Sequence, residues 1–201
     1  MGRTLTERKK PAKADLAAAA GATIPDVIAP GLRALFCGIN PGLYSGYTGY
    51  HFARPGNRFW RALYESGFTE TLLKPHQQQR LLDVGCGITN LVSRTTVSSR
   101  EITRAELDTG SCRLQEIVEL YRPWSVAILG IDAYRTAFSR PDAGVGRQPQ
   151  GIGPAPLWVL PNPSGVNGHY PPAVLAATFR DFRRDLEKLH LWPAGRLLPD
   201  G

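Results

Sequence analysis

The sequence predicts an α/β fold, a three-layer α/β/α domain with a central and mainly parallel sheet. Four short apolar runs are continuous rather than alternating, which is typical of strands buried on both faces of a parallel sheet. Helical patterns separate these runs, and strands that alternate with helices indicate helices on both faces of the sheet. The 201 residues are 42% hydrophobic, enough for one good core, so we expect one domain. The predicted strands are Arg33–Gly38, Gly87–Val92, Val126–Leu129 and Leu157–Pro161.

Between the first two strands the sequence predicts a loop and two helical segments. A long loop rich in glycine and tyrosine is expected over residues 41–57. A short helix follows over residues 58–66, with Asn57 as its N-cap residue and Gly67 just past its end. Residues 74–83 have a helical composition and lead into the second strand.

A longer helix precedes the third strand. Thr103 and Glu106 have the spacing of a capping box, which starts a helix, and Pro123 stops it. After the third strand, residues 131–138 are expected to be helical. Residues 140–156 are crowded with Gly and Pro and indicate a loop.

The two ends of the chain differ in what they predict. Residues 1–30 are basic and then rich in Ala and Pro, without a sustained amphipathic period, so we expect a flexible N-terminal extension. We place the single domain at residues 31–192 and a tail at 193–201. An amphipathic helix closes the domain over residues 173–189. Its side chains expected to face the core are Val174, Phe179, Phe182, Leu186 and Leu189.

The net charge of the chain indicates which binding partners it would attract. The formal charge is +7, from 24 Lys and Arg against 17 Asp and Glu. Such a charge attracts polyanions such as nucleic acid, although many proteins are basic for solubility alone. No apolar run approaches the roughly 20 residues that cross a bilayer, and no segment has the pattern of a signal peptide. We therefore expect a cytoplasmic protein with no membrane partner.

The cysteines and histidines argue against a metal enzyme. Cys37, Cys86 and Cys112 contain no C-x-x-C pair, so they form neither a disulfide framework nor a four-thiolate metal centre. Each is expected to be a small buried residue. The four histidines have none of the spacings typical of metal ligands. We expect no metal and no cofactor.

Two similar turns follow two of the predicted strands. The stretch FCGINPG places Asn40 directly after the first strand, and VLPNPSG places Asn162 after the fourth. In open α/β sheets, ligands bind beyond the carboxyl ends of the strands. Gly42 lets the backbone come close to a ligand there. Asn-Pro is also a common turn opener, but its occurrence at two strand ends indicates a shared binding site.

Three motifs in this order resemble the mismatch-specific uracil-DNA glycosylases, the bacterial relatives of thymine-DNA glycosylase. They are GINPG at 38–42, TGYHFARPGNRFW at 48–60 and NPSG at 162–165, and the similarity runs from about Arg33 to Leu189. The resemblance implies a uracil-DNA glycosylase-like fold and a monofunctional hydrolase of base excision repair. Such an enzyme flips uracil, or thymine or an etheno-type lesion, mispaired with guanine out of double-stranded DNA. It then hydrolyses the N-glycosidic bond and leaves an abasic site. A monomer suffices for base flipping, so we expect a monomer.

The resemblance also implies roles for residues of the first two motifs. Asn40 matches the catalytic asparagine that positions the attacking water. Phe52 matches the aromatic side chain that stacks on the extruded base, although without its motif it would be interpreted as core packing. Ser45 matches a small residue near the pyrimidine 5-position. The implied substrate-binding residues are Ile39, Gly42, Ser45, Phe52 and Asn162. An amide is not a strong base, so the enzyme should be slow.

The NPSG motif opens the loop that enters the duplex in this family. Val166 matches the apolar wedge that fills the gap left by the flipped nucleotide. The family has an arginine two residues after the wedge, where this chain has Gly168. The choice of the opposite base is therefore open, and His169 or Asn167 is a candidate for part of that role. The DNA-binding residues expected in this loop are Ser164, Gly165, Val166, Asn167 and His169.

Asp83 is a second candidate catalytic residue. It lies between a predicted helix and the second strand, and a carboxylate near the binding mouth would polarise water better than an amide. We therefore consider Asp83 an auxiliary base; the alternative is a capping or solvated surface carboxylate. Candidate phosphate clamps are Arg54, Arg58, Lys74, Arg94 and Arg100.

Two other classes of protein would share some of these features. A Rossmann-like nucleotide-binding enzyme would share the sheet, but no GxGxxG follows the first strand. A non-catalytic DNA-binding α/β module would explain the charge and the wedge loop. It leaves Asn40 and Phe52 without a role.

Overall fold

The computed structural model describes residues 11–165, 168 and 170–193. Within these residues, five strands form one sheet in the order β2-β1-β3-β5-β4. The strands are β1 Ala34–Gly38, β2 Cys86–Asn90, β3 Val126–Leu129, β4 Gly146–Arg147 and β5 Leu157–Leu160. Strands β2, β1, β3 and β5 are parallel, and β4 adds a two-residue antiparallel edge. The predicted α/β class with a mainly parallel sheet is confirmed.

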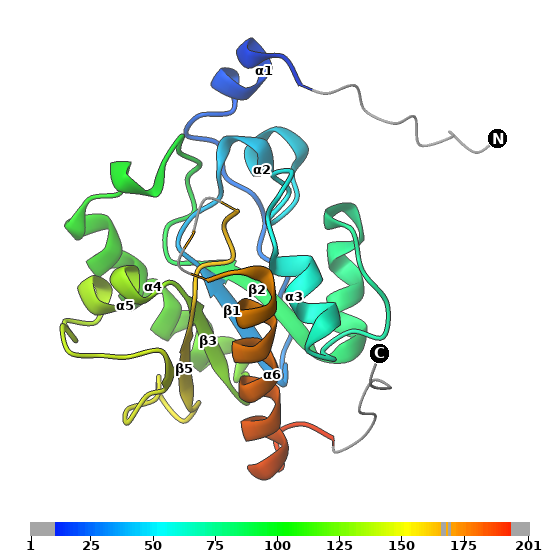
Figure 1. Ribbon diagram of the computed structural model, residues 1–201. Coiled ribbons are helices and arrows are strands. Elements are labelled where there is room, and N and C mark those ends of the chain that lie inside the picture. Colours follow the sequence, from blue (N-terminus) through cyan, green and yellow to red (C-terminus); the bar gives the residue numbers. More distant parts are fainter. Residues whose placement is uncertain (1–10, 166–167, 169, 194–201) are drawn as a thin grey trace.

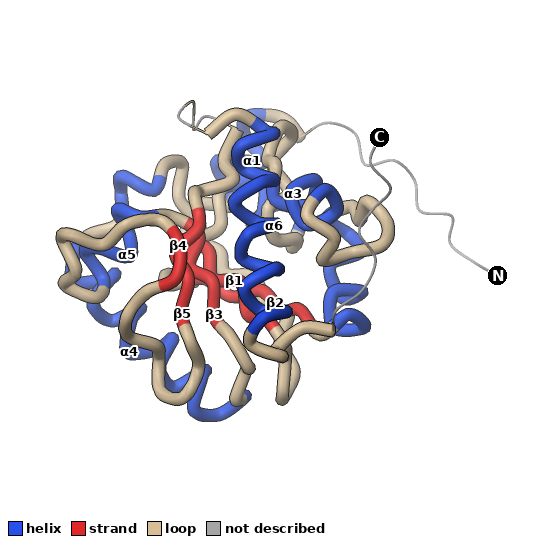
Figure 2. Tube along the Cα trace, turned by 60° about the horizontal axis from the view of Figure 1, so that its bottom comes forward, coloured by secondary structure: helices blue, strands red, loops and turns tan. Residues whose placement is uncertain are grey.

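Helices cover both faces of this sheet (Figure 1, Figure 2). The α-helices are α1 Lys13–Ala18, α2 Leu43–Thr48, α3 Phe59–Glu65, α4 Arg104–Tyr121, α5 Ile131–Ala137 and α6 Pro172–Lys188. Helices α3 and α6 pack on one face, and α4 and α5 pack on the other. Within β1, Phe36 faces the first of these cores whereas Leu35 and Cys37 face the second, because successive strand residues point to opposite faces. The sheet therefore has a hydrophobic core on each side.

Phe36 is fully buried and joins β1 to three other parts of the first core. The rings of Phe59 and Phe68 lie edge-on at 5.6 and 5.3 Å between centroids. The rings of Phe179 and Phe182 on α6 both lie at 6.0 Å. Burial of one such side chain contributes about 1.5–3 kcal/mol. The strand end that carries Asn40, two residues beyond β1, is thus anchored in a packed aromatic cluster.

The segment after β1 is more regular than the sequence predicts. Residues 43–48 form α2 rather than part of a long loop. Gly42 precedes α2 in an extended conformation, and Gly49 ends it in the left-handed region with φ of +77°, which glycine adopts at little cost. Residues 75–84 form the 3-10 helix η1, and residues 99–101 form a second one, η2. Gly42 and Gly49 thus flank a short helix in a segment whose glycine content predicts a loop.

The expectation that residues 1–30 form a flexible extension is wrong for residues 11–30. Val27 is fully buried, and it pairs with Ile88 of β2 through backbone hydrogen bonds of 2.9 and 2.8 Å. Ile24 is also buried. These residues cover the outer edge of β2, which would otherwise expose unpaired backbone groups. Residues 1–10 lie outside the described part of the chain.

Two residues that the sequence predicts to be buried, Val174 and Cys112, are exposed. Val174 is 46% exposed, because the inward stripe of α6 is Leu175, Phe179, Phe182 and Leu186, spaced at four, three and four residues. Cys112 is exposed on α4, on the side opposite to Leu114. Cys37 and Cys86 are buried as predicted, and burial raises the pKa of both thiols. No helix in the described part of the chain is both long and apolar enough to cross a membrane.

Candidate active site

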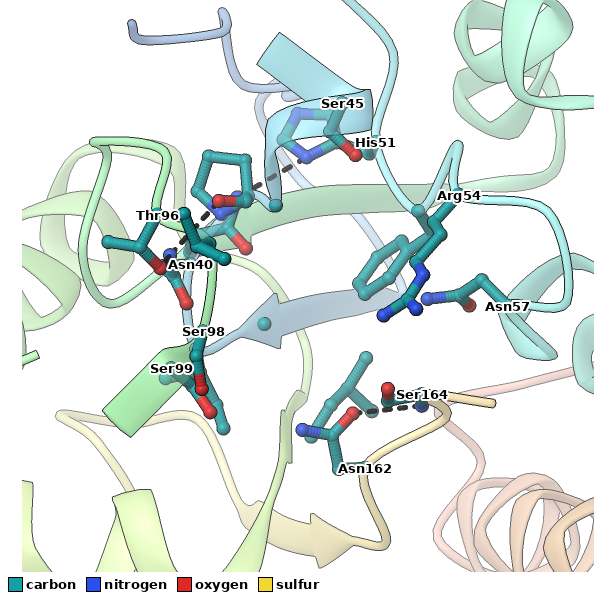
Figure 3. Close-up of a pocket in the computed structure, with 18 residues that line it drawn as sticks. Asn40, Ser45, His51, Arg54, Asn57, Thr96, Ser98, Ser99, Asn162 and Ser164 are labelled. Carbon is teal, nitrogen blue, oxygen red and sulfur yellow. Dashed lines mark hydrogen bonds between the residues drawn. The ribbon is translucent and has the colours of Figure 1, made fainter. Parts of the chain in front are cut away.

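A pocket of about 360 Å³ lies beyond the carboxyl ends of β1, β2, β3 and β5. The strand register sets Gly38 at the end of β1 beside Asn90 at the end of β2. Figure 3 shows Asn40 and Asn162 on opposite sides of this pocket, as expected when both follow parallel strands. The polar side chains that line it belong to Asn40, Ser45, His51, Arg54, Asn57, Asn90, Thr96, Ser98, Ser99, Asn162 and Ser164.

The amide of Asn40 has one fixed orientation. Its nitrogen donates to three oxygen atoms: Pro41 O at 3.0 Å, Arg94 O at 3.3 Å and Thr96 Oγ1 at 2.7 Å. A backbone carbonyl only accepts, so a flipped amide would set Oδ1 against two carbonyl oxygens. Among the described residues, no donor contacts Oδ1. Asn40 therefore offers the pocket a hydrogen-bond acceptor.

The strand ends themselves hold Asn40 in place. Val92 N donates to Ile39 O at 2.9 Å, and Thr96 N donates to Pro41 O at 3.2 Å. These bonds tie the segment after β2 to the turn after β1. Thr96 thus holds the turn through its backbone and the Asn40 amide through its hydroxyl group.

Phe52 forms an aromatic wall of the pocket. Its ring stacks on the buried Phe59 at 4.0 Å between centroids and 25° between planes. The φ angle of Phe52 is +52°, in the left-handed region where a residue other than glycine is strained by about 1–3 kcal/mol. A strained backbone with a packed ring indicates that the position of this side chain is set by its surroundings.

Gly38 and Asn90 form the floor of the pocket. A Cβ atom on residue 38 would lie 2.4 Å from Asn90 Oδ1 and 3.3 Å from Phe52 Cζ. A side chain at this position would therefore have to displace the Asn90 amide. Asn90 is only 5% exposed, and its amide oxygen lies beside Gly38.

His51 supports Asn90 from behind. The His51 ring is 2% exposed, and its Nε2 lies 2.9 Å from Pro25 O. Because a carbonyl only accepts, Nε2 carries the hydrogen, and Nδ1 is left to accept from Asn90 Nδ2 at 3.3 Å. Burial lowers the pKa of His51, against smaller raising effects of the Pro25 carbonyl and the Asp26 carboxylate. His51 is therefore neutral at neutral pH.

The loop after β5 is held at its base by Arg58. The Arg58 guanidinium donates to Ser164 O and Tyr170 O, both at 2.5 Å. Asn162 Oδ1 accepts from Ser164 N at 2.9 Å, which closes the first turn of the loop. A Cβ atom on Gly165 would lie 2.4 Å from Gly56 O. The loop after β5 is thus in direct backbone contact with the segment that contains Gly56.

The pocket brings together most of the residues that the sequence singles out. Those that line it are Ile39, Asn40, Gly42, Ser45, Phe52, Asn162 and Ser164. Gly165 lies just beyond, against Gly56. Val166, Asn167 and His169 lie outside the described residues, so their predicted roles stay predictions.

The predicted position of Asp83 at the binding mouth is wrong. Asp83 is exposed and lies in η1, which precedes β2. β2 runs parallel to β1. The amino-terminal end of β2 therefore lies at the amino-terminal ends of the strands, on the side of the sheet away from the pocket. Asp83 does not line the pocket, so the structure does not support an auxiliary base there.

Two predicted phosphate clamps have other partners. Arg58 binds the backbone of the loop after β5, and Arg94 forms an ion pair with Glu106 at 2.5 Å. Arg54 is exposed and lines the mouth, and among the described residues that line the pocket it is the one Lys, Arg, Asp or Glu. In the part of the chain described, no three His, Cys, Asp or Glu side chains come together as a metal site.

Sequence reasoning missed Asn90, His51 and Thr96. Asn90 is the last residue of β2, just as Asn40 and Asn162 come shortly after β1 and β5. The predicted second strand runs to Val92, which places Asn90 inside the strand instead of at its end. His51 and Thr96 act through contacts between distant segments, which no local pattern shows.

The chain is thus an α/β protein whose pocket has an aromatic wall and amide groups at the carboxyl ends of a mainly parallel sheet. Residues 25–188 match the Uracil DNA glycosylase superfamily, and the chain belongs to this superfamily. A solution NMR structure from Methanosarcina acetivorans, provisionally described as a uracil DNA glycosylase, has a similar fold with a TM-score of 0.52. The two chains are 18% identical, and the match covers 80% of this chain and 97% of the other.

Proposed function

We propose that the protein is a monofunctional DNA repair glycosylase that hydrolyses the N-glycosidic bond of uracil extruded from double-stranded DNA. The observation that carries this proposal is the joint placement of Asn40, Phe52 and Asn90 around one pocket. The pocket offers a flat apolar wall, an acceptor on its floor and a second acceptor at its side. A flipped nucleobase needs such a wall and such edge contacts.

The chemistry of the reaction fits a pocket whose described lining residues include no carboxylate. Cleavage of the bond develops positive charge on the sugar and negative charge on the departing base. Asn40 Oδ1 accepts a hydrogen bond from the attacking water and directs its oxygen toward the sugar. An amide removes no proton in the ground state, so acceleration comes from orientation and from stabilisation of the leaving base. We expect slow turnover, and no step requires a metal or another cofactor.

The pocket floor supports recognition of uracil. The Asn90 Nδ2 group is occupied by His51, so Oδ1 is the atom that meets the base. Uracil and thymine carry an N–H at ring position 3, which is the donor that this oxygen would accept from. Ser45 is 4% exposed and lines the pocket, and its hydroxyl oxygen accepts from Ala53 N at 3.3 Å. We infer that Ser45 faces the pyrimidine 5-position and limits access of thymine.

We propose that selectivity for a guanine mismatch depends on the loop after β5. We infer that Val166 enters the duplex, held by the loop base that Arg58 fixes. Because Gly168 stands where related enzymes have an arginine, we expect weak discrimination of the opposite base. We further propose that the enzyme works as a monomer in the cytoplasm on uracil opposite guanine, with thymine and etheno-type lesions as poorer substrates.

Single-turnover cleavage tests the proposal. A labelled duplex with uracil opposite guanine is incubated with excess protein and then treated with alkali, which breaks the strand at an abasic site. We expect strand breakage with the wild-type chain and a rate lower on the order of a hundredfold for Asn40→Ala. Asp83→Asn is the matched control, because that carboxylate is exposed and far from the pocket, and its rate should equal the wild-type rate.

The same assay decides against the alternative, a non-catalytic DNA-binding module. Intact DNA after incubation with a protein that binds the duplex would favour the binding module and remove the glycosylase proposal. A panel with uracil opposite adenine, uracil in single strands, and thymine or ethenocytosine opposite guanine then ranks the substrates.

A further inference from the structure

Asn90 is held by two residues that both contact the N-terminal segment 25–27. On one side, His51 Nδ1 accepts from the Asn90 amide, while His51 Nε2 donates to Pro25 O. On the other side, the Arg113 guanidinium donates to the backbone oxygen of Asn90 at 2.9 Å and to Asp26 Oδ2 at 2.6 Å. The floor of the pocket is therefore linked to the chain segment that covers the edge of β2.

The link through His51 fixes which end of the Asn90 amide faces the pocket. Pro25 O requires a hydrogen on Nε2, so neutral His51 has a bare Nδ1. A bare nitrogen attracts the NH2 end of the amide and turns Oδ1 away from the ring, toward Gly38. With hydrogens on both ring nitrogens, the preference would reverse, and the amide would present its NH2 end to the pocket.

The link through Arg113 fixes the backbone of the same residue. Arg113 also donates to Thr89 Oγ1 at 3.1 Å, so one guanidinium holds the last two residues of β2. Its ion pair with Asp26 is partly exposed, with side chains 35% and 19% accessible, and such pairs contribute little to stability. Its placement, rather than its strength, is what ties the N-terminal segment to the pocket.

We propose that His51 is a positioning residue that sets the Asn90 amide with its oxygen toward the extruded base, and that the segment 25–27 holds this arrangement through Pro25 O. This proposal rests on the proposed glycosylase function and extends it. It states that the choice of a base with an N–H at ring position 3 depends on the hydrogen-bonded series from Pro25 through His51 to Asn90.

Two substitutions of His51 separate positioning from packing. In His51→Gln, the new amide has an N–H group for Pro25 O and an oxygen for Asn90 Nδ2, so it supplies the same donor and acceptor types without a titrating ring. In His51→Leu, both bonds are lost while the site stays apolar and filled. We expect His51→Gln to keep the wild-type rate on uracil within about threefold, and His51→Leu to lose on the order of tenfold, the equivalent of one hydrogen bond.

A double-mutant cycle tests whether His51 acts through Asn90. Single-turnover rates on uracil opposite guanine are measured for His51→Leu, Asn90→Ala and the double variant. A positioning role predicts that the double variant is no slower than Asn90→Ala alone. If the two losses multiply, or if His51→Leu cleaves at the wild-type rate, His51 does not act through Asn90 and the proposal is overturned.

The pH profile gives a second readout that does not depend on the folding of His51→Leu. The charged groups near His51 on adjoining segments are Asp26 and Arg113, which form an ion pair with each other. Since His51 must be neutral, the wild-type rate should be constant above neutral pH and fall in acid, below the ordinary pKa of histidine. His51→Gln should lack this fall, whereas His76→Gln, at an exposed histidine on η1, should retain it.

An acid fall of equal size in the wild type and in His51→Gln would overturn the proposal. Wild-type protein that leaves uracil-containing DNA intact at every pH would instead remove the glycosylase function itself. The two failures are thus distinguished by the wild-type rate at neutral pH.

Discussion

Asn40→Asp tests the fixed orientation of the catalytic amide. The substitution replaces an NH2 group, which donates to Pro41 O, Arg94 O and Thr96 Oγ1, by an oxygen that cannot donate when ionised. The threonine hydroxyl can turn to donate, and Pro41 O keeps the hydrogen bond from Thr96 N. Arg94 O loses the Asn40 donor, and both carbonyls face a negative charge. Each lost hydrogen bond is worth about 0.5–1.5 kcal/mol, and an unsatisfied partner adds about 1–3 kcal/mol. We expect the free energy of unfolding at pH 7 to fall by about 2–4 kcal/mol.

The pH dependence of this loss has a definite sign. The two carbonyls disfavour the carboxylate in the folded protein, so the pKa of the new carboxyl is higher in the folded than in the unfolded chain. The penalty is therefore present above the folded pKa and shrinks as the pH falls through it, when the protonated group can donate again. Urea unfolding followed by tryptophan fluorescence at pH 7 and pH 5 measures both values.

Asn57→Asp is the matched control for this experiment. Asn57 Oδ1 accepts from Phe59 N at 2.9 Å at the start of α3, a bond that a carboxylate retains. A negative charge is also favourable at a helix N-terminus. We expect a change within about 0.5 kcal/mol. Equal stability of the two variants at pH 7 would refute the orientation that we assign to Asn40.

Three further outcomes are expected. Phe36→Ala should lower the free energy of unfolding by about 3–5 kcal/mol, because the ring is fully buried among four others; a loss below 1 kcal/mol in urea would contradict the core described. Arg54→Gln should reduce the slope of log affinity for duplex DNA against log salt by about one, measured by fluorescence anisotropy, whereas Arg80→Gln on the exposed side of η1 should change it less. In native protein, a thiol reagent should modify Cys112 quickly, since it is exposed, and the two buried cysteines only after unfolding; rapid reaction of all three would contradict the packing.

The elements that depend on local pattern could be predicted, and those that depend on distant contacts could not. Strand β1 and helix α4 follow from a continuous apolar run and from a capping box whose bond from Glu106 N to Thr103 Oγ1 is present at 3.3 Å. The segment around Val27 has no amphipathic period of its own. Its order comes from pairing with Ile88, about sixty residues away along the chain. Because composition does not show such a distant contact, it predicts a flexible segment here.

The site shows the same division. Asn40 and Asn162 are both predicted by one rule, that ligands bind beyond the carboxyl ends of parallel strands. The same rule applies to Asn90, which ends β2, and it excludes Asp83, which precedes that strand. The donors and acceptors that orient the Asn40 and Asn90 amides come from Thr96 and His51, and only the folded chain brings them together.

The central claim is that the pocket between Asn40 and Phe52 receives a base extruded from DNA. The most direct test is a crystal structure with a duplex that carries 2′-fluoro-2′-deoxyuridine opposite guanine, whose glycosidic bond resists hydrolysis. We predict the uracil ring stacked on Phe52, its N–H at ring position 3 within hydrogen-bond distance of Asn90 Oδ1, and a water on Asn40 Oδ1. A uracil that stays in the base stack, or that binds on another face of the protein, would contradict the account.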